Sequence, residues 1–131
     1  MKKPEISDAA RHAHEMRKQR LAEWHKEHDL RILNGIDALH RLMKIAQGNS
    51  GQCRHVANFL LSCYNGGRFK MDLSDLRCLD LDIFQDCMTV LAMDYQPMRE
   101  VHNYFESGNE LFESLATKWG IPDHIARGWI P

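Results

Sequence analysis

Apolar side chains recur at intervals of three and four residues along most of the chain, which is the period of a helix that buries one face. The clearest series consists of Ile32, Ile36, Leu39, Met43 and Ala46. Comparable series occupy residues 53–64, 83–91 and 111–119. No stretch shows the strict alternation that is typical of a half-buried strand. The pattern predicts an all-α fold, a compact helical bundle of about five to six helices.

Residues that favour helix ends separate these series. Asn65-Gly66-Gly67 and Gly120 predict C-termini, because glycine and asparagine tolerate a left-handed backbone. Pro97 predicts a further break, since proline does not fit a helix interior. The predicted N-caps are Asn49 or Ser50, Asp80, and Ser107, which would form a capping box with Glu110.

The first 31 residues differ from the rest of the chain. They carry eight basic and six acidic residues and four of the eight histidines. Their apolar stripe is thin and consists of Ala9, Ala13, Met16, Leu21 and Trp24. We expect a long charged N-terminal helix, capped by Ser7 or Asp8, as an extension over residues 1–31, followed by a helical core domain over 32–131. The pattern leaves open whether 8–28 and 30–47 are one helix or two.

At the other end of the chain, Pro122 predicts a last turn, with Trp129 and Ile130 packing the tail.

Composition narrows the possible classes of protein. The chain has 131 residues and a formal net charge of −1, which excludes a uniformly basic nucleic-acid binder. Its apolar runs, such as residues 90–93, are too short for a membrane span, and residues 1–30 are too charged for a signal peptide. Four cysteines without a Cys-x-x-Cys pair predict reduced, buried or half-buried thiols in the cytoplasm.

Motifs for catalysis or metal binding are missing. His12 and His14, or His25 and His28, are the closest histidine pairs, but no further ligand at a suitable spacing completes a zinc site. The chain has no nucleophile elbow, phosphate loop or dinucleotide fingerprint. We therefore predict a protein that is not an enzyme and has no cofactor or metal, and we keep a histidine-based metal protein or enzyme as the last alternative.

Charge is segregated along the chain. Residues 72–100 contain seven acidic and two basic residues, which suits either a solvated face or a negative patch that meets a basic partner or mimics nucleic acid. The N-terminal segment instead carries a basic cluster that could follow a phosphate backbone, although acidic residues are interleaved with it. The residues of this alternative nucleic-acid site are Arg11, Arg17, Lys18, Arg20 and Lys26.

One block of the chain resembles a known family. The block reads Ile45-Ala-Gln-Gly-Asn-Ser-Gly-Gln-Cys-Arg-His-Val-Ala-Asn-Phe-Leu-Leu and is followed by Gly67-Arg-Phe-Lys-Met-Asp-Leu-Ser-Asp-Leu and Leu79-Asp80. It is similar to an uncharacterised family of small proteins encoded on plasmids and integrative conjugative elements of proteobacteria. The resemblance covers about residues 38–119 and implies an accessory protein of mobile DNA, without an assigned activity.

These observations lead to one functional hypothesis and its alternatives. We expect a non-enzymatic binding or regulatory protein that acts through a protein partner, with a homodimer and nucleic-acid binding as further possibilities and no membrane association. The polar segment before residue 56 is either a recognition surface or a helix–loop–helix junction. The candidate partner-binding residues are Gln47, Asn49, Gln52, Arg54, His55, Asp72 and Asp75.

Overall fold

The computed structural model describes residues 5–126, and the expected packing of Trp129 and Ile130 lies outside this range. The described residues are helical and contain no strand, which confirms the all-α prediction. The chain divides into two compact units, Met1–Leu30 and Arg31–Pro131. None of the helices in residues 5–126 has the length and apolar character that a membrane span needs.

The first helix, α1, comprises Asp8–Lys26 and contains no buried residue. Of the two predicted caps, Ser7 is the one used, and its side chain accepts a hydrogen bond from the Ala10 amide. Glu27 separates α1 from α2, so the segment that the pattern left open is two helices. Because α1 buries no side chain, packing within its own unit contributes little to its stability.

The next two helices build the core of the second unit. Helix α2 comprises His28–Ala46 and buries the predicted seam except for Ile36, which is half-buried, while Leu33 stays exposed. Helix α3 comprises Gly51–Tyr64, and the Ser50 side chain accepts from the Cys53 amide at its start. Its end at Asn65 was predicted correctly but for the wrong reason, since Asn65 is extended and neither following glycine has positive φ.

A short 3-10 helix, η1 (Leu73–Cys78), leads into α4 (Leu81–Tyr95). Asp80 occupies the N-cap position of α4, but its side chain makes no capping bond and instead accepts from Gln52. Helix α4 is joined to α2 by a bidentate ion pair between Arg41 and Asp86 at 2.9 Å.

The last two elements are η2 (Val101–Tyr104) and α5 (Gly108–Trp119). The predicted capping box is wrong, because Ser107 has a left-handed backbone (φ 52°) and makes no capping bond. The chain turns sharply there because Gly108 lies directly against the carbonyl group of His102. Gly120 ends α5 with a left-handed backbone (φ 60°), as predicted.

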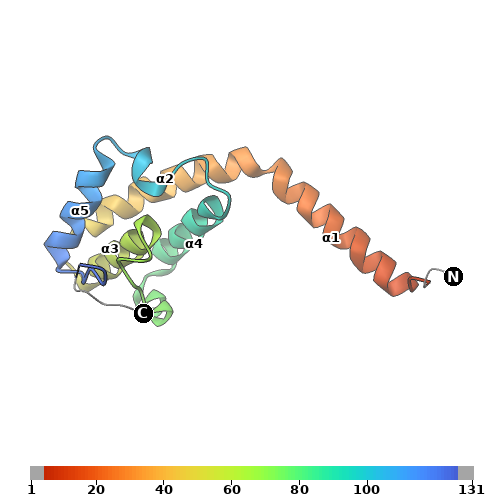
Figure 1. Ribbon diagram of the computed structural model, residues 1–131, viewed down its shortest axis with the longest axis horizontal. Coiled ribbons are helices and arrows are strands. Elements are labelled where there is room, and N and C mark those ends of the chain that lie inside the picture. The colour runs from red at the N-terminus through yellow and green to blue at the C-terminus, as the bar shows by residue number, and fades with distance from the viewer. Residues whose placement is uncertain (1–4, 127–131) are drawn as a thin grey trace. The chain divides into compact units, whose positions relative to one another are not determined.

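The hydrophobic core draws on every helix of the second unit, where α3 contacts α5, η1 and η2 (Figure 1). Within residues 5–126, all buried apolar residues lie between Ile32 and Ile121. The largest fully buried side chains include Phe69 and Phe112, and Phe112 packs edge-on against Tyr64 with 5.1 Å between ring centres. This core holds η1 and α4 in the positions from which they form a surface groove.

Candidate functional site

The polar segment 47–55 forms a junction between three helices. Lys118 of α5 donates to the carbonyl groups of Gln47 and Gly48, the latter at 2.8 Å. The Trp119 indole donates to the Ala46 carbonyl at 2.8 Å, and Arg54 donates to the Trp119 carbonyl. The end of α5 is thereby tied to the end of α2 and the start of α3.

Other predicted partner-binding residues also make contacts within the protein. The Gln52 side chain bonds both the Asp80 carboxylate and the Asp80 amide. His55 Nδ1 lies 3.7 Å from an Asp75 oxygen, which links α3 to η1. Asn49 and Asp72 are exposed. The structure thus favours the helix junction over the recognition surface for most of this segment.

The four cysteines differ in the pKa and the exposure of their thiols. Burial raises the pKa of Cys63 and of Cys87 to about 12, so both are inert thiols at neutral pH. The Ser50 hydroxyl lies 3.1 Å from the Cys53 sulfur and lowers the pKa of that thiol. Cys78 is exposed, which corrects the prediction that all four thiols are at least half-buried.

The predicted nucleic-acid residues do not share one face of α1. Arg17 and Arg20 lie on the apolar side, because Arg17 is four positions from Ala13 and Arg20 is four positions from Met16. Arg11 and Lys18 lie on the other side, seven positions apart. Acidic side chains occupy that side as well, at Asp8 and Glu15. This division weakens a phosphate-binding track along α1.

The histidines of α1 and of the first turn of α2 were the closest histidine pairs in the sequence. His12, His14 and His25 are exposed, and His28 is half-buried. In the part of the chain that the structure describes, no three His, Cys, Asp or Glu side chains gather where they could hold a metal ion.

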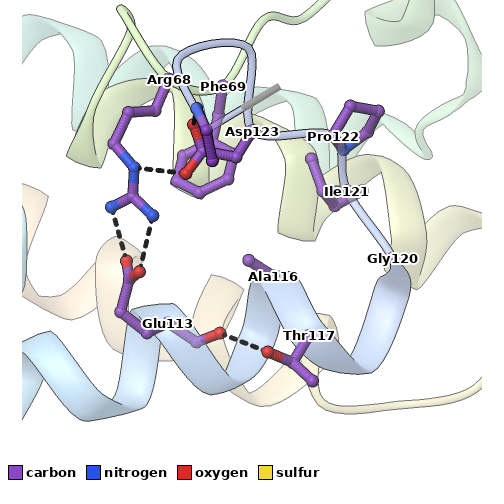
Figure 2. A pocket seen from close by; sticks show the side chains of 10 residues that line it. Arg68, Phe69, Glu113, Ala116, Thr117, Gly120, Ile121, Pro122 and Asp123 are labelled. Carbon is purple, nitrogen blue, oxygen red and sulfur yellow. Dashed lines mark hydrogen bonds and ion pairs between the residues drawn. The ribbon is translucent and has the colours of Figure 1, made fainter. Parts of the chain in front are cut away.

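A hollow of about 460 Å³ lies between α5 and the segment that follows it (Figure 2). Arg68 lies at its edge and donates two bonds to Glu113, at 2.7 and 2.9 Å, and one to Asp123, at 2.8 Å. These bonds hold the pKa of Glu113 below its ordinary value. The pKa of Asp123 is lowered first by the backbone amide of Ala126 and then by Arg68. Because the guanidinium is already paired, we assign this cluster a structural role, anchoring residues 121–126.

Removal of this anchor gives a pH-dependent prediction. We expect Arg68→Met to lower the melting temperature at pH 7 by a few degrees, because solvent screening weakens partly exposed ion pairs. The folded pKa values of both carboxyls are lowered, so their stabilisation is present above the ordinary values of 4.5 and 3.8 and is lost as the pH falls through the folded values. Thermal melts at pH 7 and in steps below pH 4.5 measure the difference, which should shrink in acid.

The matched control is Arg77→Met, which removes the same charge from an exposed side chain. It should leave the melting temperature nearly unchanged at each pH. An Arg68→Met difference that persists undiminished in acid would show that packing of the arginine, and not its ion pairs, stabilises this region.

Two further hollows flank η1, and together we call them the η1 groove. The first, of about 370 Å³, lies between η1, α3 and α4, and its apolar lining consists of Phe59, Phe69, Met71, Leu73, Leu76 and Leu91. The second, of about 360 Å³, is lined by Leu76, Arg77, Leu79, Leu81 and Phe84. Leu73 and Leu81 are 80% and 70% exposed, which is unusual for two leucines beside the same groove.

A few polar groups interrupt this apolar surface. Lys70 and Asp94 line the first hollow, and burial raises the pKa of Asp94. The Ser62 hydroxyl is buried and lacks a hydrogen-bond partner in the described structure. Apolar walls with a small number of polar groups are typical of binding sites in proteins. The η1 groove is therefore the best candidate for a binding site in residues 31–126.

The sequence interpretation missed most of this groove. It predicted Asp72 and Asp75 as binding residues in this region, but none of the leucines that line the two hollows. The sequence does contain a signal for an apolar surface here. Leucines occur at 73, 76, 79 and 81, separated by mostly polar and charged residues, without a sustained helical period. Such a segment buries part of its apolar side chains only after it packs on another element, here α3.

Comparison with known proteins places the chain in a family. Residues 36–120 match a family described as a family of unknown function (DUF7673), and the chain belongs to this family. No curated protein and no solved structure matches the chain. The matched range includes both the helix junction and the η1 groove.

Proposed function

We propose that this member of the family is a non-enzymatic accessory protein of a bacterial mobile element, which acts in the cytoplasm by binding a protein partner in the η1 groove. The association with mobile DNA rests on the resemblance of residues 45–61 to proteins of plasmids and conjugative elements. The choice of a binding role rests on one structural observation, the exposure of Leu73 and Leu81 beside apolar hollows.

The groove is suited to apolar side chains of a partner segment. Full burial of one leucine stabilises a complex by about 1.5–3 kcal/mol, and the groove offers two exposed leucines. Its surroundings are acidic, since residues 70–94 contain six aspartates, one lysine and one arginine. A partner segment with apolar residues and nearby basic residues would match both properties.

The proposal is tested by photo-crosslinking in bacterial cells that carry the mobile element. A photo-reactive amino acid is placed in the full chain at Leu73 or, in a second protein, at Leu81. The control position is Met98, which is 65% exposed and does not line the groove. We expect protein adducts at Leu73 and Leu81 and none at Met98.

A double variant provides the second measurement. Leu73→Asp/Leu81→Asp should lower the yield of the crosslink partner, recovered through a third groove position such as Arg77, by roughly tenfold or more. Folding should be preserved, because both side chains are exposed and an acidic residue is favoured at the start of α4. Equal adduct yields at Leu73 and Met98 would overturn the proposal, and adducts to nucleic acid would favour the alternative function.

A further inference from the structure

Helix α1 is a long amphipathic helix without a buried side chain. Met16 and Leu21 are 44% and 58% exposed, although most of the stability of a helix in a protein comes from packing of its apolar face. Among the described residues of this unit, 5–30, none is buried, and the buried core begins at Ile32. The helix therefore needs a partner surface elsewhere.

The apolar face of α1 is also basic. Arg17 is four positions from Ala13 and from Leu21, and Arg20 is four positions from Met16, so both arginines lie among the apolar side chains. Helix α1 as a whole contains five basic and three acidic residues and carries a charge of +2. An apolar face with arginines at its centre fits an apolar surface with acidic surroundings.

The η1 groove has these complementary properties. Residues 70–94 carry a charge of −4, and Asp72 and Asp82 are exposed next to the exposed leucines Leu73 and Leu81. The leucines can receive apolar side chains of a helix while the aspartates meet its arginines. Helix-in-groove docking of this kind uses anchors three to four residues apart, as on α1.

The connection between α1 and α2 indicates which copy supplies the helix. Glu27 is the single residue between them, and its amide still donates to the Glu23 carbonyl at 3.1 Å. A helical hairpin needs a connection of about two to five residues. The connection is thus shorter than a hairpin loop, whereas a second copy can offer its groove without such a turn.

We propose that α1 of one copy docks in the η1 groove of a second copy, and that the reciprocal contact closes a symmetric homodimer. The inference rests on the proposed function of the groove and names its occupant. Each dimer then contains two identical α1–groove contacts, as expected for a closed twofold assembly.

Complementation between two defective variants of the full chain tests this arrangement. One variant has a defective helix, Met16→Asp/Leu21→Asp, and the other has a defective groove, Leu73→Asp/Leu81→Asp. We expect the wild type to sediment as a dimer and each variant alone as a monomer, with the dissociation constant raised at least tenfold. An equimolar mixture should form heterodimers, because one intact helix then meets one intact groove.

The control is Ala22→Asp, which places one aspartate on the face of α1 away from Met16 and Leu21. It should sediment as the wild type does. Sedimentation velocity gives the masses, and native mass spectrometry of copies with different mass labels identifies the heterodimers.

Three outcomes would overturn the inference. A wild type that is monomeric at all concentrations excludes the dimer. A groove variant that still dimerises indicates pairing of α1 with α1. Two variants that fail to complement each other exclude the contact between helix and groove. In any of these cases the proposed function still stands if crosslinks from Leu73 reach another protein, and it fails separately if no protein adduct forms there.

Discussion

Substitution of Gly108 by alanine should destabilise the protein by about 3 kcal/mol or more. A Cβ atom at this position would lie 1.7 Å from the carbonyl oxygen of His102 and 2.6 Å from its carbonyl carbon. Both are backbone atoms, so no side-chain rotation can relieve the overlap. Helix α5 would have to move away from η2, which it contacts directly, and would disturb the packing of Phe112.

Urea unfolding of the full chain measures the effect, with Gly51→Ala as the matched control. Gly51 is also the first residue of a helix, but a Cβ atom there would meet no atom within 4 Å. The control should be neutral or stabilised by up to about 1 kcal/mol, because alanine restricts the unfolded chain. If Gly108→Ala were as stable as Gly51→Ala, the close approach of α5 and η2 described above would be wrong.

Substitution of Trp119 by phenylalanine should destabilise the protein by about 1–3 kcal/mol. The indole donates to the carbonyl group of Ala46, a buried residue at the end of α2 whose carbonyl has no partner within that helix. Phenylalanine preserves an aromatic ring but removes the donor. The carbonyl group would then be left without this bond in a partly buried site.

The control for Trp119→Phe is Tyr104→Phe. The Tyr104 hydroxyl is buried without a hydrogen-bond partner in the described structure, so its removal should be neutral or stabilising. Urea unfolding of both variants compares the loss of a made bond with the loss of an unmade one. A neutral Trp119→Phe would contradict the structural role of the junction and would return residues 47–55 to consideration as a recognition surface.

The candidate site was only partly predictable. The excess of acidic residues in 72–100 was visible in the sequence, and this segment contributes several of the residues that line the η1 groove. The residues predicted to bind a partner were chosen because they are polar and occur in a family-like block. Arg54 and Gln52 instead bond to Trp119 and Asp80, which are 65 and 28 positions away. Local sequence gives no information about such distant acceptors.

The sequence by itself determined the helices and several of their ends. Apolar residues three and four apart predict α2, α3 and α5, because neighbours on a helix surface are close in the chain. Ser7, Ser50 and Gly120 act where they were expected, since caps and left-handed ends depend on the adjacent backbone. Ser107 is the exception, because contact between Gly108 and His102 decides its conformation.

Only the tertiary structure decided the helix junction, the ion pairs of Arg68 and the η1 groove. Arg68 meets Glu113 and Asp123 across 45 and 55 positions of the chain, and Trp119 meets Ala46 across 73. In the groove, α3 supplies Phe59, η1 supplies Leu73 and α4 supplies Leu91. No single segment contains such a surface, because it exists only once the core has brought these elements together.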